Sequence, residues 1–287
     1  AFLQGIQGLY EKHRERIKFW VWGSSARPLK RQRAETLAGR SLSKTLWPFS
    51  QTELLQKESI VPFLFQPNLL KQHLTSEEPR NYLSKLSAWF QQTLLPEPNL
   101  ADDLSQSLDW LQSYQATYLE NEIRRENLVN DIGVFEKFLS LAAGENTQVV
   151  NYSSKAKVLN IAPHTVKTYY GILEDTFACN TIPAYSGSLR VQISKSPKIY
   201  FADAGLARFI AGERGMPVEH SAAFGALVEG FVVNEILKQT EYHGLPWKFS
   251  YLRTKTGMEV DLIISIGKEK IACEIKAATK LDSGDCK

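Results

Sequence analysis

Hydrophobic and polar residues alternate with a period of two in two stretches near the carboxyl end of the chain. In the first stretch, the apolar side chains on one face are Val260, Leu262, Ile264 and Ile266. The alternation resumes from Ile271 to Lys276, after a polar break that contains Gly267. Period-two runs on either side of a short polar break are typical of a β-hairpin, so we predict two antiparallel strands here.

The apolar pattern also suggests how these two strands pair. If Ile266 lies opposite Ile271, Asp261 faces Lys276 across the strand pair. Glu274 is then a diagonal neighbour of Asp261, at roughly 7–8 Å between the backbones. This register gathers two carboxylates and an ammonium on one side of the hairpin.

Apolar residues recur at helical spacing over much of the remaining chain. The helices predicted from this spacing cover residues 1–18, 81–93, 102–126 and 133–143. Ser50 followed by Glu53 is the pattern of a capping box, which predicts the start of another helix. Ile17–Ala26 is an aromatic and β-branched run that closes in Gly-Ser-Ser, and it predicts a buried strand that enters a polar loop.

A helix-turn-helix is predicted in the middle of the chain. Ser154–Leu159 and His164–Glu174 form its two helices, with Pro163 in the first turn of the second. Ala178–Tyr185 and Leu189–Ser194 are then the expected strands of a wing. The side chains expected to contact a phosphate backbone are Lys155, Lys157, His164, Thr165, Lys167, Thr168 and Arg190. Because winged helices also serve as protein–protein modules, DNA and a protein partner both remain open.

The composition sets limits on these hypotheses. With 43% hydrophobic and 23% charged residues, the chain is an ordinary globular protein, and its net charge of +3 is too small to indicate nucleic-acid binding by itself. Cys179, Cys273 and Cys286 have no paired spacing, which argues against a zinc site or a disulfide framework and favours a cytoplasmic location. No apolar run approaches the ~18 residues of a membrane span, so no membrane partner is expected. Residue 1 is alanine and the chain stops soon after Lys276, so both ends look cut.

The acidic residues of the hairpin are candidates for a metal site. Asp261 and Glu274 supply hard oxygen ligands, and Mg²⁺ prefers a small number of carboxylates together with water and phosphate. Lys276 beside them can orient a water or screen the charge that develops on a phosphate. The hairpin therefore predicts a Mg²⁺ site for phosphodiester chemistry, with a solvated and charge-balanced strand face as the alternative.

The same residues resemble a known signature. Asp261, followed after twelve residues by Glu274-Ile275-Lys276, resembles the motif of PD-(D/E)XK nucleases, and Glu229 resembles the acidic residue of their preceding helix. The resemblance implies catalytic roles for Asp261, Glu274 and Lys276. It also implies that Glu229, Asp261 and Glu274 hold Mg²⁺, that Ile275 lends its backbone carbonyl to the metal, and that Lys276 assists the attacking water.

Four short motifs are more specific than that signature. They are Phe224-Gly-Ala-Leu-Val-Glu229, Tyr251-Leu-Arg-Thr254, Glu259-Val-Asp261 and Glu274-Ile-Lys276. They resemble a domain of unknown function that is attached to prokaryotic AAA-type ATPases and is regarded as restriction-endonuclease-like. This resemblance implies the same fold for the carboxyl-terminal part of the chain.

The amino-terminal part resembles the second half of an AAA-type ATPase core. The motifs that carry this resemblance are Gly23-Ser-Ser25, Leu37-Ala-Gly-Arg40 and Pro48-Phe-Ser-Gln-Thr-Glu53. It implies that Ser25 and Arg40 are remnants of a nucleotide site, with ATP bound only in the full-length protein. No Gly-x-x-x-x-Gly-Lys-Ser/Thr phosphate loop occurs in the chain, so these 287 residues should not hydrolyse ATP by themselves.

These observations predict an α/β protein. Its expected parts are a remnant of an AAA-type core at 1–60, a helical lid or linker at 61–130, a winged helix at 131–210 and a restriction-endonuclease-like domain at 211–287. The leading functional hypothesis is an ATPase-associated fragment that acts on or binds DNA with Mg²⁺. The alternative is a non-catalytic DNA- or protein-binding regulator, or an assembly module that self-associates.

Overall fold

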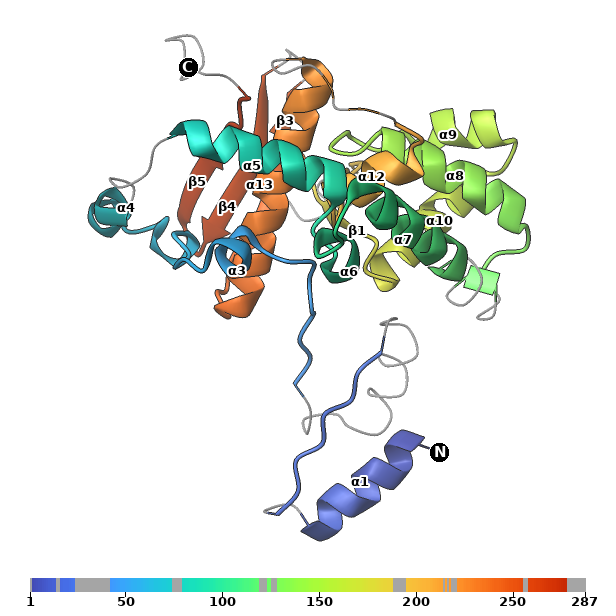
Figure 1. Cartoon of the computed structure of the whole chain (residues 1–287), viewed down its shortest axis with the longest axis horizontal. Coiled ribbons are helices and arrows are strands. Elements are labelled where there is room, and N and C mark those ends of the chain that lie inside the picture. Colours follow the sequence, from blue (N-terminus) through green and yellow to red (C-terminus); the bar gives the residue numbers. More distant parts are fainter. Residues whose placement is uncertain are drawn as a thin grey trace.

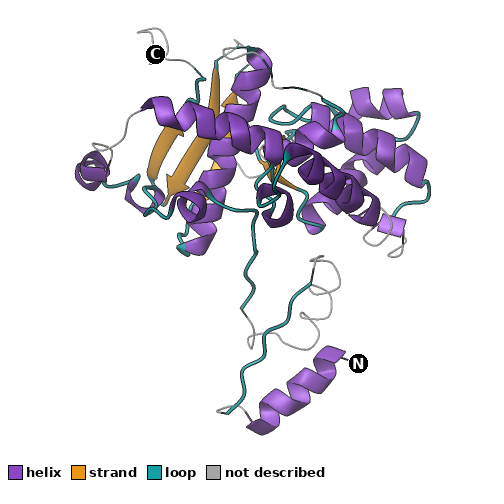
Figure 2. Cartoon of the chain, viewed as in Figure 1, coloured by secondary structure: helices purple, strands orange, loops and turns teal. Residues whose placement is uncertain are grey.

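The computed structural model describes residues 2–13, 16–23, 42–73, 79–118, 123–124, 128–187, 195–213, 215, 217, 221–254 and 258–277. Its helices are α1 (Phe2–His13), α3 (Gln51–Leu55), α4 (Pro67–His73), α5 (Pro79–Gln92), α6 (Pro96–Asn99), α7 (Leu104–Thr117), α8 (Ile132–Gly144), α9 (Tyr152–Leu159), α10 (Pro163–Asp175), α12 (Ala204–Ile210) and α13 (Ala222–Tyr242), with a 3-10 turn η1 (Val61–Phe63). Its strands are β1 (Cys179–Ile182), β2 (Lys198–Phe201), β3 (Lys248–Arg253), β4 (Glu259–Ile266) and β5 (Glu269–Cys273). The fold is therefore mixed α/β, mostly helical, with small sheets (Figures 1 and 2).

The helices predicted from apolar spacing are largely confirmed. α1, α5, α7 and α8 lie at the four predicted ranges, with ends that differ by a few residues and a shorter carboxyl end for the first and third. The capping box is also confirmed, because the Ser50 hydroxyl accepts a hydrogen bond from Glu53 N–H while the Glu53 carboxylate accepts one from Ser50 N–H. None of the described helices is both long and apolar enough to cross a bilayer.

The predicted buried strand at 17–26 is wrong over the part that the structure describes. Residues 17–23 are extended but belong to no sheet, and Trp20 and Trp22 are 80% and 85% exposed. In Figure 1 this segment and α1 lie away from the main body. An apolar strand is buried only when a neighbouring strand or helix covers it, and the described residues provide no such cover here.

The two helices of the predicted helix-turn-helix are confirmed, but its wing is not. α9 and α10 are joined at Asn160, whose left-handed φ of 53° ends α9, and both helices pack on α8 around Phe138, Val166 and Tyr169. β1 falls within the first predicted wing strand. However, it pairs antiparallel with β2, whereas the predicted partner at 189–194 lies outside the described residues.

The predicted hairpin exists as β4 and β5, but in a different register. Ile266 pairs with Glu269 rather than with Ile271, and the ladder continues to the pair Leu262 and Cys273. The polar break forms a turn of only two residues, which Gly267 permits by adopting a φ of +56°. The pairing is therefore offset by two residues, so each side chain keeps its predicted face while its partner changes.

Helix α13 lies between the three-stranded sheet β3-β4-β5 and helix α5. Val233 and Ile236 belong to the apolar cluster that includes strands β3 and β4, whereas Phe231 stacks on Trp89 of α5 with ring centroids 5.7 Å apart. The β1–β2 pair joins this arrangement through a parallel bridge between Ala184 and Tyr251. α13 thus joins the three-stranded sheet to α5, whereas α8, α9 and α10 pack in a separate apolar cluster.

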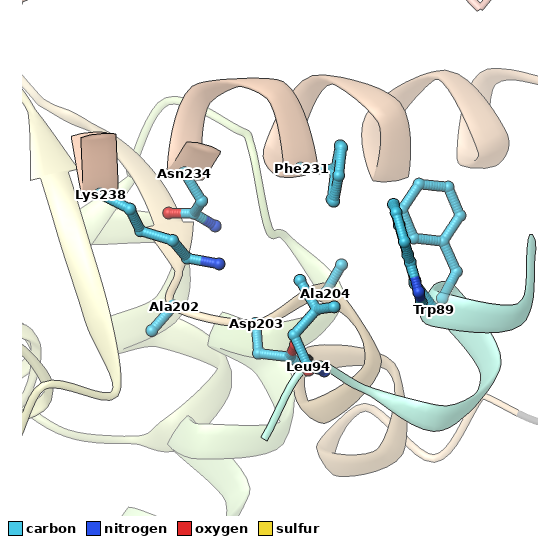
Figure 3. A pocket seen from close by; sticks show the side chains of 9 residues that line it. Trp89, Leu94, Ala202, Asp203, Ala204, Phe231, Asn234 and Lys238 are labelled. Carbon is cyan, nitrogen blue, oxygen red and sulfur yellow. Dashed lines mark hydrogen bonds between the residues drawn. The ribbon is translucent and has the colours of Figure 1, made fainter. Parts of the chain in front are cut away.

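Asp203 connects α12 to the end of α5, as Figure 3 shows. One of its carboxylate oxygens accepts Leu206 N–H and the other accepts Leu94 N–H, each at 2.6 Å, so Asp203 caps the amino-terminal end of α12. This close approach requires glycine at position 205, because a Cβ there would lie 2.7 Å from the backbone of Thr93. The cavity beside these residues measures only about 10 Å³, which leaves room for at most one water molecule.

Candidate functional site

A buried lysine collects the acidic residues of the carboxyl-terminal part. The Lys198 ammonium on β2 lies 2.7 Å from Glu229 Oε1, 3.2 Å from Asp261 Oδ1 and 3.3 Å from Glu259 Oε1. Its side chain is only 3% exposed. The Tyr200 hydroxyl donates a further hydrogen bond of 2.7 Å to Glu229 Oε1. We call Lys198, Tyr200, Glu229, Glu259 and Asp261 the acid–lysine cluster.

The cluster follows from the local structure of three elements. Lys198 and Tyr200 are two residues apart on β2, so their side chains leave the strand on the same face. Glu229 comes from the middle of α13, which Ser221 caps by accepting Phe224 N–H. Asp261 comes from β4, and the same periodicity holds its side chain in register with that of Glu259.

The predicted metal and catalytic residues divide into two groups. Glu229 and Asp261 converge as the resemblance implied. Glu274 and Lys276 instead form their own ion pair at 2.7 Å, with side chains 32% and 40% exposed. The Ile275 N–H donates to Asp261 Oδ2 at 2.9 Å. The actual register accounts for this contact, since it brings the residues after β5 opposite Asp261.

This arrangement does not fit a Mg²⁺ ion. Both oxygens of Asp261 are engaged, one by the Lys198 ammonium and the other by the Ile275 N–H. Glu229 Oε1 is shared between Lys198 and Tyr200. Across the described ranges, no three His, Cys, Asp or Glu side chains form a group that could hold a metal. The ammonium of Lys198 lies between these carboxylates and neutralises part of their charge.

Burial and charge shift the protonation of the cluster in opposite directions. Burial alone would lower the pKa of Lys198, but Glu229, Asp261 and Glu259 outweigh it, so the pKa rises above its ordinary value of 10.5. Burial also raises the pKa of Glu229, which the nearby Lys198 opposes. Burial and the Glu229 carboxylate raise the pKa of the Tyr200 phenol. At neutral pH the cluster therefore holds a charged lysine and a neutral tyrosine.

The raised pKa of Lys198 predicts a loss of stability in alkali. A folded-state pKa above the unfolded one stabilises the protein fully below about pH 10.5, and this contribution is lost as the pH rises through the folded value. We expect wild type to lose more free energy of unfolding than Lys198→Met between pH 9 and pH 11.5, as measured by urea titration. Parallel curves for the two proteins would contradict this expectation.

The candidate DNA-contacting residues lie mainly on one surface. Lys157, His164, Lys167 and Thr168 are exposed on α9 and α10, and Thr165 is half-buried. Lys155 differs from them, since its side chain is buried, forms an ion pair with Glu145 and lies over the Tyr170 ring. Its charge is therefore not available to a phosphate. Arg190 lies outside the described residues.

The nucleotide-site candidates Ser25 and Arg40 also lie outside the described residues. The segment that follows them is anchored to α13. Lys238 donates to Phe49 O at 2.9 Å, and Glu235 accepts Gln51 N–H at the same distance. Glu241 accepts Trp47 Nε1–H at 2.8 Å. Polar side chains on a helix this deeply buried would be unfavourable without such partners.

Comparison with known families divides the chain into three matched ranges. An AAA domain matches residues 1–55, one domain of unknown function (DUF8612) matches 83–216, and another (DUF4143) matches 224–287. These matches support an AAA-type ATPase-like family. Lys198 belongs to the second matched range, and its three acidic partners belong to the third.

Two curated mycobacterial proteins are similar to part of the chain. These are the uncharacterized protein Rv2008c of Mycobacterium tuberculosis and the uncharacterized protein Mb2031c of Mycobacterium bovis, each 24% identical over 183 residues. The aligned region covers 63% of this chain and 41% of each relative, so the chain spans about two fifths of their length. No solved structure gives a significant match.

Sequence reasoning missed Lys198 as a site residue. The signal was present, because the lysine stands at the start of the run Lys198-Ile-Tyr-Phe201, whose other residues are apolar or aromatic. A lysine in such a strand is buried only when it is paired with acids. The carboxylates of Glu229 and Asp261, which were already candidate site residues, are the acids that pair with it.

Proposed function

We propose that this chain is a non-catalytic coupling module of an AAA-type ATPase, which ties an ATPase segment to a DNA- or protein-binding part. The observation that carries the proposal is the occupation of the acidic site by Lys198. The ammonium of Lys198 lies within 3.3 Å of an oxygen of each of three carboxylates, where a divalent cation shared by these acids would have to lie. The same contacts join two separately matched ranges of the chain.

Helix α13 supports the proposal because it contacts every matched range. Glu235 and Lys238 hold the 49–51 segment of the AAA-type range. Asn234 donates to Phe201 O at 2.6 Å, and Glu229 binds Lys198, so the helix also holds the middle range. Such a buried polar network fixes one relative position of the parts it joins, since any shift would break several hydrogen bonds together.

The exposed face of α9 and α10 is the surface that we propose for the partner. Lys157, His164 and Lys167 are exposed there, and they would contact a phosphate backbone without reading its sequence. Such contacts weaken steeply as salt rises.

The experiment that tests this function is nicking of a supercoiled plasmid. With Lys198 bound to the acids, we expect equal, background nicking with Mg²⁺ and with EDTA, both for wild type and for Asp261→Asn. The same samples report plasmid binding by gel shift at increasing salt. Nicking by wild type that requires Mg²⁺ and disappears in Asp261→Asn would overturn the proposal.

A Mg²⁺-dependent nuclease is the second candidate. It is favoured by the convergence of Glu229 and Asp261 and by the position of Glu274 next to Ile275, which touches Asp261. For this activity the Lys198 ammonium must leave the carboxylates, because it occupies the space between them. The nicking experiment separates the two functions directly.

A further inference from the structure

A second site lies apart from the acid–lysine cluster, between β1, the carboxyl-terminal half of α13 and β3. It is an open groove of about 480 Å³, within the size range of sites that hold small ligands or short peptides. The apolar side chains that line it are Trp47, Ile182, Pro183, Leu237, Leu245 and Phe249. None of the residues of the acid–lysine cluster lines it.

Two buried polar atoms in this groove have no hydrogen-bond partner among the described residues. They are the Asn180 amide nitrogen and the Thr240 hydroxyl oxygen. Thr240 is only 6% exposed, so its hydroxyl is shielded from bulk solvent. Buried polar groups are rarely left unpaired, and both residues line the same groove, where a rotation of each side chain would bring its polar atom to a ligand.

The backbone around the groove explains why it is open. β1 runs on into a parallel pairing with β3, where Tyr185 N–H donates to Tyr251 O at 2.6 Å and Tyr251 N–H donates to Pro183 O at 3.0 Å. The next bond of this ladder requires an N–H from Pro183, which proline lacks. The two strands therefore separate at this point. Because hydrogen bonding alternates along a strand, the backbone N–H and C=O groups of Thr181 on β1 and Phe249 on β3 point toward each other across the groove.

The charges around the groove restrict what can enter it. Glu174 and Glu241 line it, and no lysine or arginine does. Glu174 accepts a hydrogen bond from the Thr181 hydroxyl, and Glu241 is held by Thr45 and Trp47. Phosphates and free carboxylates are therefore disfavoured. A peptide segment without charged ends fits better, because its backbone can pair with the open strand edges and a basic side chain can lie near the two glutamates.

We propose that this groove binds an extended internal peptide segment of a partner protein, which lies along the open edges of β1 and β3. Its amide groups pair with the backbones of Thr181 and Phe249, and one of its carbonyls accepts the Asn180 amide. The Thr240 hydroxyl completes the polar contacts, and a lysine or arginine of the peptide lies next to Glu174. This mode of recognition adds a strand to an exposed sheet edge.

The test uses tetrapeptides that are randomised at every position, acetylated at one end and amidated at the other. We expect immobilised wild-type chain to retain members rich in lysine or arginine, as identified by mass spectrometry. Thr240→Val should retain them about fivefold less, which is the factor that one hydrogen bond supplies. The melting temperature of Thr240→Val should not fall, because the hydroxyl has no partner in the free protein.

A second variant keeps the proposal testable if the first does not fold. Pro183→Ala restores the missing N–H, so β1 and β3 should pair further, the groove should narrow and retention should fall at least as far. Equal retention by wild type and both variants, or no retention by wild type, would overturn the proposal. So would equal retention of the same pool with free carboxylates.

Discussion

Replacing Lys198 with methionine is expected to lower the free energy of unfolding by about 3–5 kcal/mol, the usual cost of removing one partner from a buried ion pair. Methionine fills nearly the same space, so the loss is electrostatic rather than steric. It leaves the carboxylates of Glu229 and Asp261 buried with no counter-ion. Urea titration at pH 7, followed by circular dichroism, measures the change.

The control for this substitution is Lys248→Met on β3. Lys248 is exposed, so its replacement should change the free energy of unfolding by less than about 0.5 kcal/mol. Adding Glu229→Gln to Lys198→Met should restore part of the lost stability, because one of the uncompensated charges is removed. If Lys198→Met and Lys248→Met had the same small effect, the acid–lysine cluster would not be formed in solution.

Replacing Lys238 with methionine is expected to cost about 3 kcal/mol and to loosen the segment that follows the predicted nucleotide-site residues. Lys238 is fully buried and connects Glu235, at 3.0 Å, to the carbonyl of Phe49. Its loss leaves a buried carboxylate and a buried carbonyl short of a donor. Relative to wild type, amide exchange in the variant should accelerate more at residues 49–55 than in α8. The free energy of unfolding should also fall.

The matched comparison is the double variant Lys238→Met with Glu235→Gln. The second substitution removes the Glu235 charge that Lys238→Met leaves without a partner. The double variant should therefore recover about half of the lost free energy of unfolding, while Phe49 O stays unpaired. Exchange at 49–55 should remain fast in the double variant. Uniform acceleration across α8 and α13 would show instead that Lys238 stabilises the whole fold without anchoring this segment, which would contradict the coupling role.

The elements with strong periodicity could be predicted from the sequence. The two helices of the helix-turn-helix and the carboxyl-terminal hairpin appear, because their apolar spacing depends only on local geometry. The helix that carries Glu229 was expected only from motif resemblance, and it appears as α13. The hairpin register was wrong by two residues. Apolar matching favoured Ile266 opposite Ile271, whereas the two-residue turn at Gly267 decided the pairing.

The candidate site was predicted only in part, because it depends on contacts between distant segments. The convergence of Glu229 and Asp261 was anticipated from motif resemblance. The position of Lys198 between them was not anticipated, because no local sequence pattern indicates which strand packs against which helix. Lys155 shows the same limit, as its helical position predicted exposure but its ion pair with Glu145 buries it.

The β4–β5 hairpin also determines where the sheet stops growing. β5 is an edge strand, paired only with β4 in the part of the chain that the structure describes, and Lys268, Glu269 and Lys270 are exposed at its turn end. A further strand from another molecule would have to strip water from this row of charges to dock there. The charged end of β5 thus opposes edge-to-edge pairing of this sheet with a second molecule, even at high protein concentration.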